Sequence, residues 1–129
     1  MESRHISQVI RTDAHRVYAF AREPETLVHW AAGLAQSEVE MRGEGLIAQS
    51  PMGEVIVRFV PRNDLGVLDH DVTLPTGETV SNPLRVVAHP EGAEIVFTVR
   101  RLGSAEEDFD ADCATVAADL ERLRAILEA

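Results

Sequence analysis

The chain contains no lysine, a single cysteine and no long apolar run. Without lysine, it can form neither a lysine Schiff base nor the phosphate contact of a P-loop lysine. A single cysteine, Cys113, excludes an internal disulfide and a cysteine metal cluster, and it is consistent with a reducing compartment. Because no apolar run approaches the roughly 18 residues of a membrane span and no signal peptide is evident, we expect a cytoplasmic protein.

Motifs typical of metal and phosphate sites are also missing. The histidines at positions 5, 15, 29, 70 and 89 show no His-x-x-x-His pairing, and neither Gly-x-Ser-x-Gly nor a glycine-rich phosphate loop occurs. In Asp69-His70-Asp71, alternation along a strand would turn the aspartates away from the histidine, so the three could not share one ion. We therefore expect no metal and no cofactor.

The formal net charge of −10 makes a nucleic-acid partner unfavourable, because phosphate binding needs a basic surface. All twelve basic residues are arginines. Arginine could indicate bidentate anion recognition, but the abundance of alanine favours a compositional bias of the genome. A length of 129 residues, with 45% apolar and 26% charged residues, is typical of one globular domain over residues 1–129.

The N-terminal third of the sequence predicts a strand followed by two helices. Residues 5–10 suit a strand, and Thr12 or Asp13 caps a helix with Val17, Tyr18, Phe20 and Ala21 on its apolar face. Pro24 then begins a short second helix that ends near Trp30.

Six further strands are predicted, separated by short turns rich in glycine and proline. They lie at Gln36–Arg42, Gly45–Gln49, Glu54–Val60, Val67–Leu74, Thr79–Ala88 and Glu94–Arg101. This regular spacing predicts an antiparallel meander. Pro83, inside one candidate strand, indicates a bulge or an edge position there.

The last segment predicts one long amphipathic helix. Ser104-Ala-Glu-Glu107 has the pattern of a capping box, and an apolar stripe follows at alternating spacings of four and three. The stripe consists of Phe109, Cys113, Val116, Leu120, Leu123 and Leu127. Because it must pack against the sheet, we expect an α+β fold in which a seven-stranded antiparallel sheet curls around this helix and the two short helices close one end.

This order of elements, together with Asp13-Ala-His-Arg-Val-Tyr-Ala-Phe-Ala, Pro24 and Trp30, resembles the START-like (SRPBCC) superfamily, also called the birch-pollen-allergen or helix-grip fold. The chain looks most like small bacterial proteins described as polyketide cyclase/dehydrase. The resemblance covers nearly the whole chain and marks a fold rather than a reaction. It implies an internal cavity between sheet and helix, in a superfamily that includes lipid carriers, hormone receptors and cyclases.

Strand alternation places two polar side chains on the expected cavity wall. His70 belongs to the apolar face of one strand and Asn82 to that of the next. A three-residue turn at Pro75-Thr76-Gly77 sets the two residues opposite each other. A slip of one residue would bury Asp69 and Asp71 instead, at several kcal/mol each.

Two interpretations of this pair remain open. His70 and Asn82 could orient a ligand or act as a general base with an amide partner, or they could satisfy each other as a structural pair. Trp30 could likewise stack on a ligand or only pack in the core.

The facing of the last strand depends on the turn before it. A three-residue loop at Pro90–Gly92 would turn Arg100 inward, whereas a four-residue loop would turn Phe97 inward. The cost of burying an unpaired arginine favours Phe97. The predicted ligand-binding residues are His70, Asn82, Trp30, Phe97 and Phe109.

We expect a binding protein for a small lipophilic or aromatic molecule. The alternative is a cyclase or dehydratase in which His70 removes a proton next to a carbonyl and Asn82 holds the oxyanion. Only Gln8 offers a third inward polar group. Because catalysis of this kind needs a base, a group that orients it and an oxyanion donor, the small number of polar groups favours binding. Monomer and homodimer both remain open.

Overall fold

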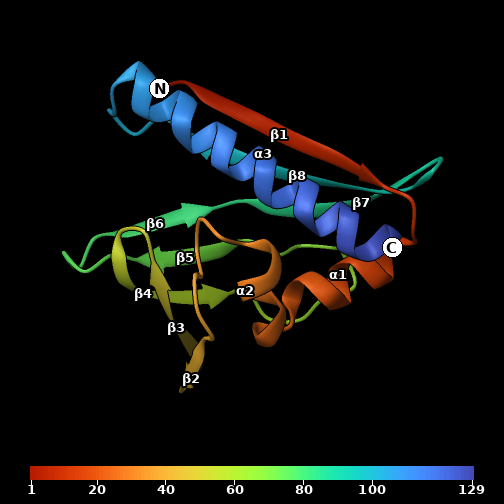
Figure 1. Ribbon diagram of the computed structural model, residues 1–129, viewed down its shortest axis with the longest axis horizontal. Helices are drawn as coiled ribbons and strands as arrows, with labels where there is room; N and C mark the ends of the chain where they lie inside the picture. The colour runs from red at the N-terminus through yellow and green to blue at the C-terminus, as the bar shows by residue number, and fades with distance from the viewer.

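The computed structural model describes all residues, 1–129, and has the predicted α+β class (Figure 1). The strands are β1 (Ser3–Ile10), β2 (Glu40–Arg42), β3 (Gly45–Ser50), β4 (Gly53–Phe59), β5 (His70–Thr73), β6 (Thr79–Asn82), β7 (Leu84–His89) and β8 (Gly92–Arg100). The helices are α1 (Ala14–Arg22), a 3-10 turn (Pro24–Thr26), α2 (Leu27–Trp30) and α3 (Glu106–Glu128).

The prediction of one seven-stranded sheet is wrong, because the structure has eight strands in two antiparallel sheets. One sheet has the order β1-β8-β7 and the other the order β2-β3-β4-β5-β6. The predicted strand 79–88 is interrupted at Pro83, which has no N–H to donate to a ladder. Its carbonyl accepts a hydrogen bond from Thr98 N at 3.0 Å, and the chain passes from one sheet into the other at this residue.

The predicted hairpin between β5 and β6 is confirmed. His70 pairs with Asn82 and Val72 with Val80. Leu74 N donates to Glu78 O at 2.8 Å, and Gly77 closes the turn with a φ of 91°, which glycine adopts without strain.

The break at Pro83 does not reverse which side chains face inward. Leu68 N still donates to Leu84 O at 2.8 Å, and both side chains are buried.

The predicted facing of the last strand is also correct, although the turn before it differs from both predicted lengths. His89 pairs with Gly92, so only Pro90 and Glu91 form the loop. Ile95 and Val99 are buried, while Arg100 is exposed and donates to Ser3 Oγ at 3.0 Å.

The two longer helices begin differently. Asp13 caps α1 as predicted, accepting a hydrogen bond from Arg16 N at 2.9 Å. The predicted capping box of α3 is wrong: the N-cap is Ala105, which has no side-chain acceptor, and the helix begins at Glu106. Ser104 Oγ instead donates to Arg101 O at 2.7 Å in the preceding turn.

The apolar stripe of α3 divides between two hydrophobic clusters. Leu120, Leu123 and Leu127 belong to a core of 20 buried residues that draws on both sheets, α1 and α2. Phe109 and Cys113 form a separate cluster with Val99 of β8. Figure 1 shows α3 running along β1 and β8, with β4 to β6 and α2 across from it. No helix is long and apolar enough to cross a membrane.

Candidate functional site

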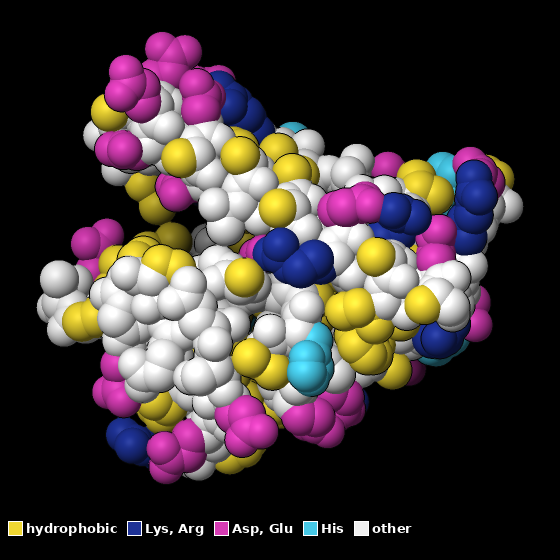
Figure 2. All heavy atoms as spheres, viewed as in Figure 1, with side chains coloured by type: hydrophobic (Ala, Val, Ile, Leu, Met, Phe, Trp, Pro, Cys, Tyr) yellow, Lys and Arg dark blue, Asp and Glu magenta, His cyan; other side chains and the backbone are white.

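A cavity of about 290 Å³ lies between α3, β8, α2 and the five-stranded sheet. Figure 2 shows the hollow in the surface between the start of α3 and the sheet, bordered by apolar side chains. Its wall includes Leu27, Trp30, Leu34, Met52, Phe59, His70, Val72, Leu74, Val80, Asn82, Leu84, Phe97, Val99, Leu102, Asp112, Thr115, Val116, Asp119 and Leu120. Most of these residues come from α2, α3, β8 and the five-stranded sheet.

Four of the five predicted site residues line this cavity: His70, Asn82, Trp30 and Phe97. Phe109 lies outside it. The Phe109 ring is fully buried in the cluster with Val99 and Cys113, and the Arg4 guanidinium carbon lies 4.5 Å from its centroid. Phe109 thus packs at the start of α3 and does not contact the cavity.

His70 is held between two phenylalanines and a backbone carbonyl. Its ring centroid lies 5.0 Å from that of Phe59 and 5.9 Å from that of Phe97. Nδ1 lies 2.9 Å from Leu68 O. Because a carbonyl only accepts, Nδ1 carries the proton and Nε2 of the neutral ring is left as an acceptor.

The surroundings of His70 favour this neutral form. The side chain is 5% exposed, and burial lowers the pKa of His70. The hydrogen bond to Leu68 and the charges of Asp69 and Asp71 act against burial but do not outweigh it. At neutral pH the cavity therefore presents an uncharged imidazole.

Asn82 stands opposite His70 in the strand register, yet no hydrogen bond joins their side chains. Asn82 Nδ2 donates to Val80 O at 3.4 Å, so each side chain bonds to the backbone carbonyl two positions before it. Each keeps hydrogen-bonding capacity that the protein does not use.

No carboxylate orients His70, because Asp69 is engaged on the other face of β5. Asp69 forms a two-pronged ion pair with Arg85, at 2.8 Å to Nε and 2.7 Å to Nη2, and accepts from Leu84 N at 2.9 Å. The hydrogen bond from Arg85 is the main reason that the pKa of Asp69 is lowered. Asp69 therefore fastens the start of β7 to β5 beside the break at Pro83.

Trp30 closes the cavity at the end of α2. The Trp30 side chain is 5% exposed. Its indole Nε1 is the only solvent-inaccessible side-chain nitrogen or oxygen without a hydrogen-bond partner.

The sequence interpretation missed Asp119, which also lines the cavity and is 8% exposed. Asp119 Oδ2 accepts from Gly33 N at 3.2 Å, and Oδ1 pairs with Arg122. Burial raises the pKa of Asp119 despite these partners.

Gly33 lies so close to α3 that an added Cβ would stand 2.8 Å from Thr115 Cγ2. Asp119 thus holds the loop after Trp30 against α3. The spacing of three between Asp119 and Arg122 could have indicated the ion pair, but not the loop as its partner.

Comparison with known proteins supports the fold. No protein-family model matches the chain, and no curated protein matches its sequence. Among solved structures, XoxI from Bacillus cereus superposes with a TM-score of 0.74 at 14% identity, covering 98% of this chain and 96% of that one. The Aha1 dimer from Colwellia psychrerythraea gives 0.76 at 12% identity, covering 99% and 97%. The chain therefore shares the fold of these proteins, the helix-grip fold.

A third similar structure is DynU16, a protein from the dynemicin biosynthetic locus. It superposes with a TM-score of 0.76 at 12% identity over 99% of this chain, which spans 48% of that chain. At these identities the likeness shows the helix-grip fold and carries no activity with it.

The helix-grip cavity thus combines an apolar wall with few polar groups. His70 Nε2 can accept a hydrogen bond, and the Asn82 amide can both donate and accept. Both oxygens of Asp119 are occupied within the protein. No group of three His, Cys, Asp or Glu side chains is placed to hold a metal ion.

Proposed function

We propose that the chain binds a small lipophilic or aromatic molecule in this cavity. Fifteen of its 23 lining residues are hydrophobic, the composition typical of small-molecule sites. Its volume of about 290 Å³ lies at the lower end of the range for such sites, roughly 300–1,000 Å³. The ligand is therefore compact.

The observation that carries this proposal is the unused hydrogen-bonding capacity of His70 and Asn82 on an apolar wall. Buried polar groups that only support the fold are normally satisfied within the protein or by water, because leaving them unpaired costs free energy. Here both side chains face the cavity while their remaining polar atoms have no protein partner. Such groups are what fixes a ligand's orientation in an otherwise apolar site.

A cyclase or dehydratase with His70 as general base is the second candidate. The unprotonated Nε2 of His70 favours it, since a base needs a free lone pair. Two features count against it: no carboxylate contacts the imidazole, and a lowered pKa makes His70 a weak base. Binding is accordingly the better supported function.

The proposal is tested by titrating the protein with naphthalene, an apolar probe that needs no polar anchor. Val80→Phe places a ring on the cavity wall and should weaken naphthalene binding more than tenfold. Val87→Phe is the matched control, since Val87 is exposed on β7 and does not line the cavity. Equal affinity of both variants and the wild type would contradict binding in this cavity.

A second measurement addresses the natural ligand. Native mass spectrometry of the wild type purified from its source should show a bound small molecule that Val80→Phe purified in parallel lacks. Finding the same added mass on both proteins would place the ligand elsewhere.

A further inference from the structure

The hydrogen-bonding direction of His70 is set by the backbone. Leu68 O lies 2.9 Å from Nδ1 and takes its proton, and Nε2 has no hydrogen-bond partner. Trp30 Nε1 is the only solvent-inaccessible side-chain nitrogen or oxygen that lacks a partner. His70 Nε2 also lacks a partner, so it must be accessible, and His70 lines the cavity. The cavity thus presents a fixed acceptor that a ligand can satisfy only with a donor such as a hydroxyl.

No positively charged side chain is buried in the cavity. Arg100 is the single arginine that lines it, and its exposed side chain donates to Ser3 Oγ at 3.0 Å. The chain has no lysine. A carboxylate placed at His70 Nε2 would therefore face a lone pair instead of a proton, with no buried positive side chain to offset its charge.

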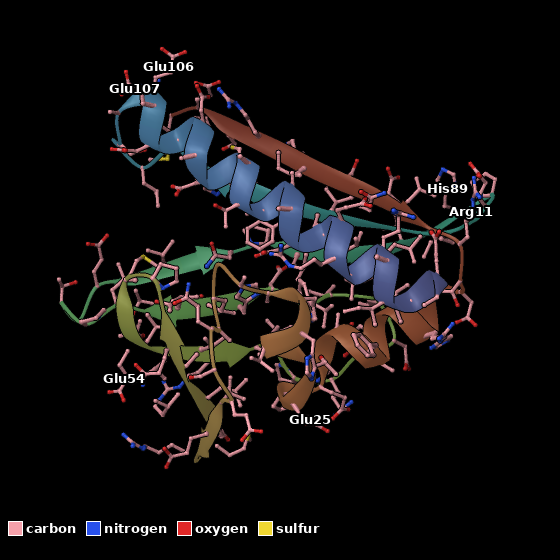
Figure 3. The ribbon with its side chains drawn as sticks, viewed as in Figure 1. Arg11, Glu25, Glu54, His89, Glu106 and Glu107 are labelled. Atoms are coloured by element: carbon pink, nitrogen blue, oxygen red, sulfur yellow. The ribbon has the colours of Figure 1, made fainter.

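Two of the three charged side chains that line the cavity, Asp112 and Asp119, are acidic, and the third is Arg100. Figure 3 places Glu106 and Glu107 at the start of α3, the end of the helix beside which the hollow opens. The resulting negative potential disfavours anions further.

Aromatic side chains surround the acceptor. The rings of Phe59 and Phe97 flank the imidazole, and the indole of Trp30 lines the same cavity. A flat apolar ligand body can pack against these rings while its hydroxyl meets Nε2.

We propose that the cavity selects neutral hydroxyl-bearing ring compounds, whose hydroxyl donates to His70 Nε2, over carboxylic acids of the same shape. This inference rests on the proposed binding function and specifies its ligand class.

The test compares three probes of one shape: 2-naphthol, naphthalene and 2-naphthoic acid, titrated calorimetrically at pH 7.5. The carboxylic acid is ionised at this pH and the naphthol is not. We expect 2-naphthol to bind roughly fivefold more tightly than naphthalene, the gain from one net hydrogen bond, and 2-naphthoate to bind more weakly than naphthalene.

His70→Phe keeps an aromatic ring and removes the acceptor. In this variant 2-naphthol should fall to the affinity of naphthalene, while naphthalene itself changes little. His89→Phe is the control, because His89 lies in the β7–β8 hairpin away from the cavity (Figure 3).

The possible failures are distinguishable. Equal binding of 2-naphthol and naphthalene, or preference for 2-naphthoate, overturns the inference and leaves cavity binding intact. Absence of binding by all three probes overturns the proposed function as well. A ¹⁵N spectrum that shows a protonated Nε2 in the free protein at pH 7.5 also overturns the inference.

Discussion

The two halves of α3 lie in different surroundings. In the C-terminal half, Leu120, Leu123 and Leu127 pack into the main core shared by both sheets. In the N-terminal half, Phe109 and Cys113 pack with Val99 of the three-stranded sheet, and the cavity opens on the side of the five-stranded sheet (Figure 1). A stripe that is continuous in sequence therefore joins the main core in one half and a separate small cluster beside the cavity in the other.

The interruption at Pro83 accounts for this difference. Up to Asn82 the chain pairs with β5, and from Leu84 onward it pairs with β8, which packs against α3 together with β1. The five-stranded sheet thereby separates from the three-stranded one near the N-terminal half of α3. The space between them is the cavity, with Phe97 on one wall and His70 on the other.

The largest expected effect tests the packing of the two halves directly. Leu123→Ala should lower the free energy of unfolding by about 2–5 kcal/mol, because Leu123 is fully buried in the main core. Val116→Ala should cost less than about 1 kcal/mol, since Val116 is half-buried and borders space that already exists. Urea denaturation of both variants measures the difference, and equal losses would contradict uneven packing.

How far the sequence predicts this arrangement depends on the range of the interactions involved. The pairing of His70 with Asn82 was predictable, because it follows from strand alternation and one short turn, both local properties. The facing of Phe97 was predictable from the cost of burying Arg100, even though the turn length was not.

Features that depend on contacts between distant segments were not predictable. The alternation pattern runs unbroken through Pro83, so it gives no sign that the two sides of this residue belong to different sheets. The role of Asp119 depends on Gly33, which lies 86 positions earlier in the sequence. Phe109 fits the apolar stripe as well as Leu120 does, and only tertiary packing separates it from the cavity.

The next largest effect concerns Asp119, which lies where the two halves of α3 meet. Asp119→Ala should cost about 1–3 kcal/mol, because it leaves Gly33 N without its acceptor. Asp119→Asn keeps an oxygen for Gly33 and should cost less. Urea denaturation followed by the fluorescence of Trp30, the only tryptophan, measures both variants. A loss as large in Asp119→Asn as in Asp119→Ala would show that the charge, rather than the hydrogen bond, holds the loop.

A smaller effect on the free energy of unfolding is expected from a change of pH, through His70 on the cavity wall. Burial lowers the pKa of His70, so the unfolded chain, with an ordinary histidine pKa of about 6.5, binds its proton first as pH falls. The free energy of unfolding should therefore decrease below about pH 6.5, by at most about 1.4 kcal/mol per pH unit from this residue.

Comparison of the wild type with His70→Phe between pH 7.5 and 5.5 isolates this contribution. The carboxyls of Asp112 and Asp119, whose pKa values are raised, favour folding at lower pH and are common to both proteins. The stability of His70→Phe should decrease less over this interval, whereas His89→Phe should follow the wild type. Parallel curves for the wild type and His70→Phe would contradict a neutral buried His70.

The smallest effect concerns the first turn of α3, which belongs to the N-terminal half. Ala105 has the extended backbone of an N-cap, with φ −63° and ψ 152°, but no side chain that can accept a hydrogen bond. Ala105→Ser should add this acceptor and stabilise the protein by about 0.5–1 kcal/mol. The matched variant Ser104→Ala should show no such gain, because Ser104 Oγ donates to Arg101 O and does not cap the helix.

Amide hydrogen exchange should slow in the first turn of α3 in Ala105→Ser and stay unchanged around Leu123, because the C-terminal half is held by the main core instead. Uniform slowing along the whole helix would mean that the two halves open together, and the difference in their packing would then have no counterpart in local stability.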